Sequence, residues 1–80
     1  MNVPKFFFDI LSHDERIDDP IGMEFSNVYS ARVEALKAAR ELMVACLIGS
    51  DAVFDIVDEQ GITIAKVPFA EALRTDDTVR

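Results

Sequence analysis

One face of the first apolar segment of the chain is wholly apolar. In residues 5–11, KFFFDIL, the even positions are all apolar, whereas the odd positions include Lys5 and Asp9. A period of two, with aromatic and branched side chains, is typical of a β-strand. Residues 12–20 are polar and acidic and end in Asp-Asp-Pro, which is typical of a turn. Residues 22–25 resume the alternation, so the pattern predicts a second strand that returns on the first.

Residues 26–48 follow a helical period instead. Ser26 or Asn27 is suited to cap the first turn, and Gly49 is suited to end the helix in the left-handed conformation. At about 100° per residue most apolar side chains fall on one arc, which we expect to face the sheet. That arc comprises Val28, Ala35, Leu36, Ala39, Leu42, Met43, Cys46 and Leu47, and the polar row opposite comprises Glu34, Lys37 and Glu41.

Two further apolar runs, residues 53–58 and 62–67, flank the short segment Glu-Gln-Gly. A three-residue loop with glycine in its last position predicts a β-hairpin in which Ile56 pairs with Ile64. Pro68 ends the second strand, because its nitrogen has no hydrogen to donate. Residues 69–73 can form one helical turn, and we expect residues 74–80 to fray.

These elements predict an α+β fold of order β-β-α-β-β, in which an antiparallel four-stranded sheet carries one long helix on one face. Eighty residues allow a single domain, with an ordered core over about residues 4–73. The predicted core comprises Phe8, Ile10, Leu42, Met43, Phe54, Ile56 and Ile64.

The charge of the chain restricts its partners. Fifteen acidic residues against eight Lys and Arg give a formal charge of −7, and the basic residues are scattered singly. We therefore expect neither nucleic acid nor an anionic membrane surface as a partner. No apolar run approaches the roughly 18 residues of a membrane span, and the amino end lacks the pattern of a secretory signal. The single cysteine, Cys46, cannot close an internal disulfide, which fits a cytoplasmic location.

Four stretches of the chain resemble an uncharacterised family of very small proteins from alphaproteobacteria, especially rhizobia. The stretches are KFFFD at residues 5–9, DPIGMEF at 19–25, ARVEA at 31–35 and VPFAEAL at 67–73. The resemblance implies one compact β-β-α-β-β domain. The family is a domain of unknown function, so the resemblance implies no activity, cofactor or catalytic residue.

We find no catalytic, cofactor-binding or metal-binding constellation in the sequence. His13 is the only histidine and lies in the polar loop, whereas Cys46 falls in the predicted buried arc. A nucleophile with its base and a set of nitrogen or sulfur metal ligands are therefore both missing. The acidic loop around Asp18 and Asp19 is expected to be solvated, which leaves open a weak cation site or a contact with a basic protein.

Arg32 falls inside the apolar arc of the predicted helix. We expect its stem to cover the core while its guanidinium leaves at the sheet edge, onto Asp9 or Glu24. The alternative is an anion-binding role for a small carboxylate or phosphate ligand, which no glycine-rich phosphate loop supports.

Surplus apolar residues predict self-association. The sheet face away from the helix is expected to carry Phe7 and Leu11, together with Val53, Val57 and Val67. The polar row of the helix also gives way to apolar residues near its carboxyl end, at positions 44 and 48. Segment 68–73 is too short to cover all of this surface.

The sequence therefore predicts a cytoplasmic, non-enzymatic protein-interaction module that forms a homodimer, either through the open sheet face or through Val44 and Ile48. Two alternatives stay open. One is a small-ligand sensor or minor enzyme that uses Arg32 and the acidic loop. The other is an antitoxin-like regulator that binds a basic protein.

Overall fold

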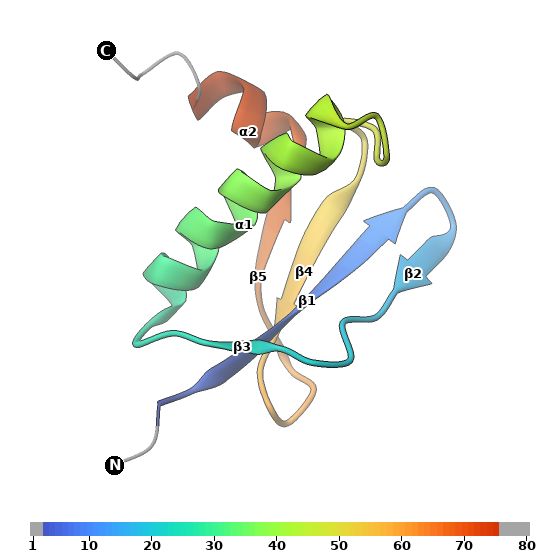
Figure 1. Ribbon diagram of the computed structural model, residues 1–80. Coiled ribbons are helices and arrows are strands. Elements are labelled where there is room, and N and C mark those ends of the chain that lie inside the picture. The colour runs from blue at the N-terminus through green and yellow to red at the C-terminus, as the bar shows by residue number, and fades with distance from the viewer. Residues whose placement is uncertain (1–2, 76–80) are drawn as a thin grey trace.

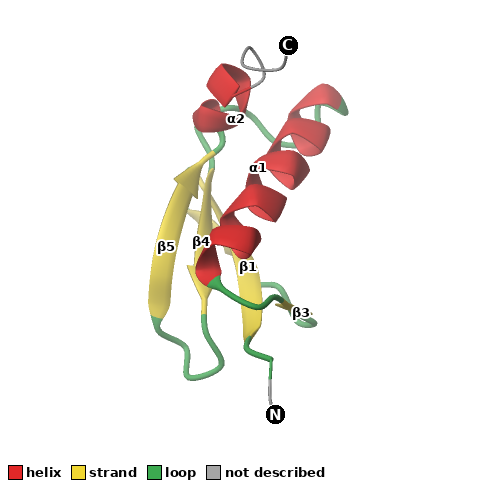
Figure 2. Cartoon of the chain, turned by 90° about the vertical axis from the view of Figure 1, so that its left-hand side faces the viewer, coloured by secondary structure: helices red, strands yellow, loops and turns green. Residues whose placement is uncertain are grey.

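The computed structural model describes residues 3–75 of the chain. Strands form one layer, and two helices cover one face of it (Figures 1 and 2). The α+β class is confirmed, and the predicted order of elements is extended by one short strand. The elements are β1 (Lys5–Ser12), β2 (Glu15–Ile17), β3 (Met23–Glu24), α1 (Val28–Val44), β4 (Val53–Val57), β5 (Thr63–Pro68) and α2 (Ala70–Thr75).

The sheet has the order β2-β1-β4-β5, and all neighbouring strands are antiparallel. The short strand β3 also pairs with β1, where Phe6 lies opposite Met23. The strand missed by the sequence patterns is β2, which pairs with the carboxyl-terminal half of β1 and lies within the predicted acidic loop. β1 and β4 are therefore the central strands, and their register places Phe8 opposite Ile56.

The buried face of helix α1, which packs on the sheet, consists of alanine residues. Ala31, Ala35 and Ala39 recur every four residues on the side of α1 that faces the sheet, and all three are fully buried. Their small side chains let the helix approach strands that carry bulky residues, chiefly β4 and β5. The side chain of Asn27 caps the helix by accepting a hydrogen bond of 2.9 Å from the backbone N–H of Ser30, so one of the two predicted caps is confirmed.

The carboxyl end of α1 comes earlier than predicted. Cys46, not Gly49, takes the left-handed position after the helix, with φ of 61°. The backbone N–H groups of Cys46 and Leu47 donate to the carbonyls of Met43 and Leu42, which is the Schellman pattern. The placement of Cys46 and Leu47 in a buried arc was therefore wrong, because the chain has left the helix at these positions and both residues are exposed.

The β4–β5 hairpin has a bulge that the sequence pattern did not predict. Its loop closes between Asp58 and Ile62, whose N–H and carbonyl are joined at 2.9 Å, as expected for a three-residue loop. One pair further on, the register shifts, so that Ile56 pairs with Ala65 and not with Ile64. Ile64 is consequently exposed, and its place in the predicted core was wrong.

The chain after β5 completes the core. Val67 pairs with Phe54 and is fully buried on the helix side, which corrects its predicted place on the open sheet face. The backbone N–H of Phe69 donates to the carbonyl of Ala52 at 2.9 Å, and the buried Phe69 and Ala72 anchor α2. The predicted helical turn is confirmed and extends to residue 75, and the rest of the predicted frayed tail lies outside the described residues.

Most of the predicted core residues do pack together, but unequally. Phe54 and Ile56 are buried, whereas the others, apart from Ile64, are half-buried against the central cluster. Val28, predicted to face the sheet, is exposed. The residues half-buried against the cluster include Phe8, Ile10, Leu42 and Met43.

Within residues 3–75 no helix has the length and apolarity needed to cross a bilayer.

Candidate functional site

Two carboxylates face each other at the centre of the sheet face turned away from the helices. Asp9 of β1 lies directly opposite Asp55 of β4, and their exposed fractions are only 8% and 3%. Arg16 of β2 reaches between them: its Nη2 bonds to Asp9 Oδ2 and lies 3.0 Å from Asp55 Oδ2. Thr63 Oγ1 donates to Asp55 Oδ1 at 2.8 Å. We call Asp9, Arg16, Asp55 and Thr63 the ionic cluster.

The ionic cluster joins four strands through two ion pairs and one hydrogen bond. Hydrogen bonds to Asp9 and Asp55 raise the pKa of the Arg16 guanidinium, and they outweigh the opposing effect of desolvation. Arg16 Nε also lies 3.2 Å from Asp18 Oδ1, so Asp18 continues the cluster into solvent. Because both buried carboxylates accept from one guanidinium, the arrangement holds the strands in register rather than presenting a free acid or base.

The side chain of Asp19 closes a gap in the sheet edge. Phe8 lies between the part of β1 that pairs with β3 and the part that pairs with β2, and Asp19 Oδ2 accepts from its backbone N–H at 3.0 Å. Asp19 Oδ1 accepts from the N–H groups of Ile21 and Gly22, both at 3.1 Å. The Asp19 N–H itself donates to Asp9 Oδ1 at 2.9 Å, which ties this loop to the ionic cluster. The prediction of a solvated acidic loop is therefore confirmed at Asp18 and was wrong at Asp19, which is built into the sheet.

These bonds change the titration of Asp19. Partial burial acts to raise the pKa of its carboxyl, but the backbone N–H groups of Phe8, Gly22 and Ile21 outweigh burial and hold that pKa below its ordinary value of 3.8. When the pKa of a carboxyl is lower in the folded state than in the unfolded state, its ionised form stabilises the fold. This stability is fully present above the unfolded-state pKa and is lost as the pH falls through the folded-state pKa. Asp19 is consequently ionised at neutral pH.

We expect Asp19→Asn to lower the free energy of unfolding by about 1–3 kcal/mol at pH 7, because an amide is a weaker partner for the three N–H donors. The loss should shrink as the pH falls from 3.8 through the lower folded-state pKa, because the wild-type carboxylate then becomes protonated in the folded protein as well. Urea unfolding at pH 7 and at pH 2.5 measures both effects. The matched control is Asp18→Asn, which removes the same charge from an exposed side chain and should cost no more than about 1 kcal/mol. An equal loss for the two variants would contradict the role given to Asp19.

A cleft of about 210 Å³ opens between α1 and the edge of the sheet. It forms because α1 lies chiefly over β4 and β5, which leaves the helix side of β1 partly uncovered. The rings of Phe8 and Phe54 meet edge to face there, with centroids 5.8 Å apart. Asp19 lines the cleft from the loop and Glu34 from α1. The full lining is Phe8, Asp19, Gly22, Met23, Glu34, Ala38 and Phe54.

Phe7 and Leu11 lie on the open sheet face, as the alternation predicted, but both are half-buried. The ring of Phe7 packs so closely on Gly22 that a Cβ there would lie 2.8 Å from Phe7 Cε2. Gly22 also has φ of 75°, a conformation that other residues adopt at a cost. With the ionic cluster at its centre, this face is not the continuous apolar surface that we expected.

Arg32 does leave the core side of α1, but its partner differs from both predicted ones. Its Nη2 lies 3.2 Å from Glu71 Oε1 on α2, not on Asp9 or Glu24. The reason is that the carboxyl-terminal helix folds back beside α1, a long-range contact that the helical period alone does not reveal. The pair fastens α2 to α1.

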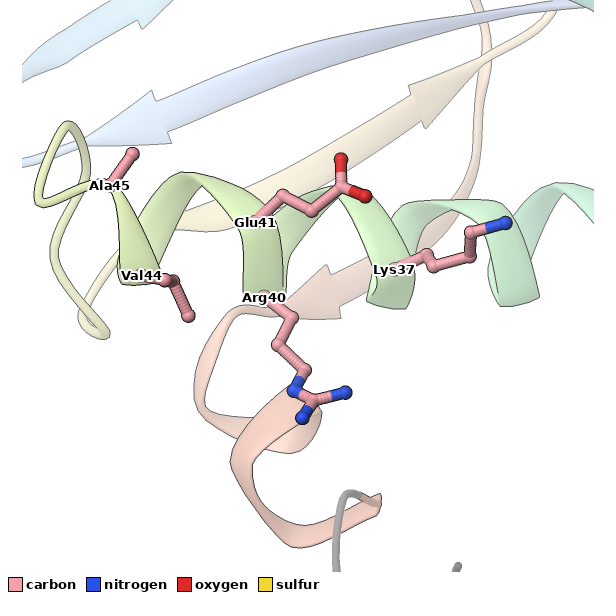
Figure 3. A pocket seen from close by; sticks show the side chains of 5 residues that line it. All are labelled: Lys37, Arg40, Glu41, Val44 and Ala45. Atoms are coloured by element: carbon pink, nitrogen blue, oxygen red, sulfur yellow. The ribbon is translucent and has the colours of Figure 1, made fainter.

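The predicted apolar patch at the end of α1 is divided in the structure. Val44 is exposed, whereas Ile48 lies beyond the helix and is half-buried against the core. Val44 borders a shallow hollow of about 320 Å³ on the outer side of α1. Figure 3 shows the three charged side chains of the hollow spreading in different directions, with the two apolar residues at the helix end. The lining is Lys37, Arg40, Glu41, Val44 and Ala45.

His13 and Cys46 lie apart and both are exposed. His13 occupies the β1–β2 turn, where its Nδ1 lies 3.6 Å from Asp51 Oδ2. The prediction of a solvated histidine is confirmed, whereas the prediction of a buried cysteine was wrong. Over the described residues, no three His, Cys, Asp or Glu side chains gather in an arrangement suited to a metal ion.

Sequence reasoning missed Arg16 and the pairing of Asp9 with Asp55. A signal was present, because each aspartate is a lone charge at the centre of an apolar strand, FFFDIL in one case and VFDIV in the other. Such a residue is tolerated only when a partner neutralises it. Phe8 was recognised as apolar core but not as the floor of a cleft, and Glu34 was assigned to the solvated row of α1.

A family model described as Domain of unknown function (DUF6894) matches residues 5–70. The chain belongs to this family. No curated protein and no solved structure matches the chain. In this DUF6894 domain the match runs from the start of β1 to the first residue of α2, so it contains the whole ionic cluster and the whole lining of the cleft.

Proposed function

We propose that this DUF6894 domain is a non-enzymatic protein-interaction module that self-associates through the outer face of α1. The observation that carries the proposal is the exposure of Tyr29, Val33 and Val44, at 71%, 46% and 78%. At about 100° per residue these positions lie within about 60° of one another, on the side of α1 opposite the alanines. We call them the α1 ridge.

The α1 ridge is a better candidate than the other surfaces considered. On the open sheet face, Phe7 and Leu11 are already half-buried and the centre is ionic. Strand-to-strand pairing along the β5 edge is disfavoured by the bulge and by Pro68, which has no N–H to donate. A two-fold contact of α1 with α1 of a second copy removes large apolar side chains from water, which is the main driving force of association.

The net negative charge of the chain opposes this association. Each copy carries a formal charge of −7, so two copies repel at low ionic strength. Added salt screens this repulsion while leaving the apolar contact intact. The dimer should therefore become tighter as salt is raised, the reverse of binding to nucleic acid. The same acidity supports proteins, rather than nucleic acids, as partners, and the cytoplasmic location stays a prediction.

The alternative of a ligand site at Arg32 has less support, because Glu71 already engages its guanidinium. A second observation, the cleft beside β1, favours a cationic ligand, because its described lining includes Asp19 and Glu34 and no basic residue.

Sedimentation equilibrium of the whole chain at micromolar concentration tests self-association. We expect a mass above the 8.9 kDa of one chain, and Val44→Asp should restore the monomer by placing a charge in the contact. The matched control is Ile62→Asp, which places the same charge at a residue that is 59% exposed in the β4–β5 loop. A wild-type mass near 8.9 kDa at every concentration would reject the dimer, and equal effects of the two variants would reject the α1 ridge.

A further inference from the structure

The cleft between α1 and β1 combines an aromatic floor with acidic walls. Phe8 and Phe54 form the floor, and the two acidic residues come from opposite sides, Asp19 from the loop and Glu34 from the helix. Among its described lining residues none is basic. The surface is separate from the α1 ridge, because Glu34 and Ala38 lie on the flank of the helix toward β1.

Each part of this lining favours positive charge. The faces of aromatic rings carry partial negative charge and attract ammonium and guanidinium groups. Glu34 and Asp19 add negative charge at the walls, although both carboxylate oxygens of Asp19 already accept from the backbone N–H groups of Phe8, Ile21 and Gly22. An anion would meet repulsion from both walls, and a neutral molecule would gain only the apolar floor.

The size of the cleft limits the ligand. Its volume of about 210 Å³ is below the roughly 300–1,000 Å³ of sites for drug-sized molecules. Ala38 contributes no long side chain, so the space between the walls stays open. We propose that the cleft binds a small organic cation, a primary ammonium carried on a short apolar or aromatic body. This goes beyond the proposed self-association, since it needs no second copy of the chain.

Three probes of similar shape test the charge preference: benzylammonium, benzyl alcohol and benzoate. In two-dimensional NMR of the whole chain, benzylammonium should cause saturable shifts of the backbone amides of Gly22 and Ala38. We expect saturation at millimolar concentration, because a ligand with so few atoms can gain only a small binding free energy. Benzoate should cause none. Equal binding of benzyl alcohol and benzylammonium would overturn the role of charge, and the lack of any saturable shift with benzylammonium would overturn the site.

Three variants locate the binding. Glu34→Gln keeps the shape of the side chain and should weaken the binding of benzylammonium about three- to fivefold, roughly the value of one partly exposed charge contact. Ala38→Leu should abolish binding by filling the cleft. Glu41→Gln is the matched control, because it removes one charge from the same helix outside the cleft, and affinity should stay within about twofold. If Glu41→Gln weakens binding as much as Glu34→Gln, the cleft is not the site. Since none of these variants replaces a residue of the α1 ridge, sedimentation of each variant separates this result from self-association.

Discussion

Replacing Phe54 with alanine is expected to lower the free energy of unfolding by about 3–5 kcal/mol. Phe54 is only 3% exposed, and its ring contacts those of Phe8 and Phe69, with centroids 5.8 and 4.8 Å away. Removing it leaves a cavity among the rings of Phe8 and Phe69 and the rest of the central cluster. A small domain is stabilised by about 5–15 kcal/mol in total, so the variant should be close to unfolded. Urea unfolding followed by circular dichroism measures the loss.

Phe8→Ala is the matched comparison. Phe8 lies one strand away and is half-buried, because one side of its ring forms the floor of the cleft. Its removal deletes the same atoms but leaves a space already open to solvent, so the loss should be clearly smaller than for Phe54. Equal losses would mean that α1 covers Phe8 in solution and that the cleft is closed.

Replacing Arg16 with methionine should have the second large effect. Without the guanidinium, Asp9 and Asp55 face each other across β1 and β4 with little access to water. Removing one partner of a buried ion pair is strongly destabilising, because the charge that remains is buried without an opposite charge beside it. Here two like charges remain, so we expect a strongly destabilised domain at pH 7.

The pH dependence of this variant identifies the cause. The repulsion exists only in the folded state, so the folded variant holds protons on these carboxylates more tightly than the unfolded chain does. Its stability should therefore rise as the pH is lowered from 7 toward 5, whereas that of the wild type should not. Adding Asp9→Asn to Arg16→Met should restore part of the stability at pH 7. If acidification or the second substitution brings no recovery, Arg16 acts through packing and not through charge.

Local patterns were sufficient to predict the elements that form through short-range contacts. The alternation in residues 5–11 predicted the two faces of β1, and the cap at Asn27 with the helical period predicted α1. The strand β2 could not be predicted in this way. Its three residues are exposed and include two charges, and it is held in place by pairing with β1 and by the contacts of Arg16.

The remaining differences arise from geometry that no periodicity encodes. One bulge in β5 moved Ile64 out of the core and brought Ala65 opposite Ile56. The helix ended where Cys46 adopts a left-handed conformation, although residues with better preference for it follow. The cleft could not be predicted from the sequence patterns either, because it depends on which strands α1 covers. The position of α1 depends on the packing of its alanine face on the sheet and on its contacts with α2.

The position of β1 in the sheet has a consequence for synthesis. β1 is made first, yet its central partner β4 follows only after the whole of α1, since Phe7 pairs with Val57. While the chain emerges from the ribosome, only the β1–β2 hairpin and the helix can form from local contacts. The aromatic run of residues 6–8 therefore stays without its core until β4 and the segments that follow it have been translated. During that interval the nascent domain should present an aromatic segment to chaperones.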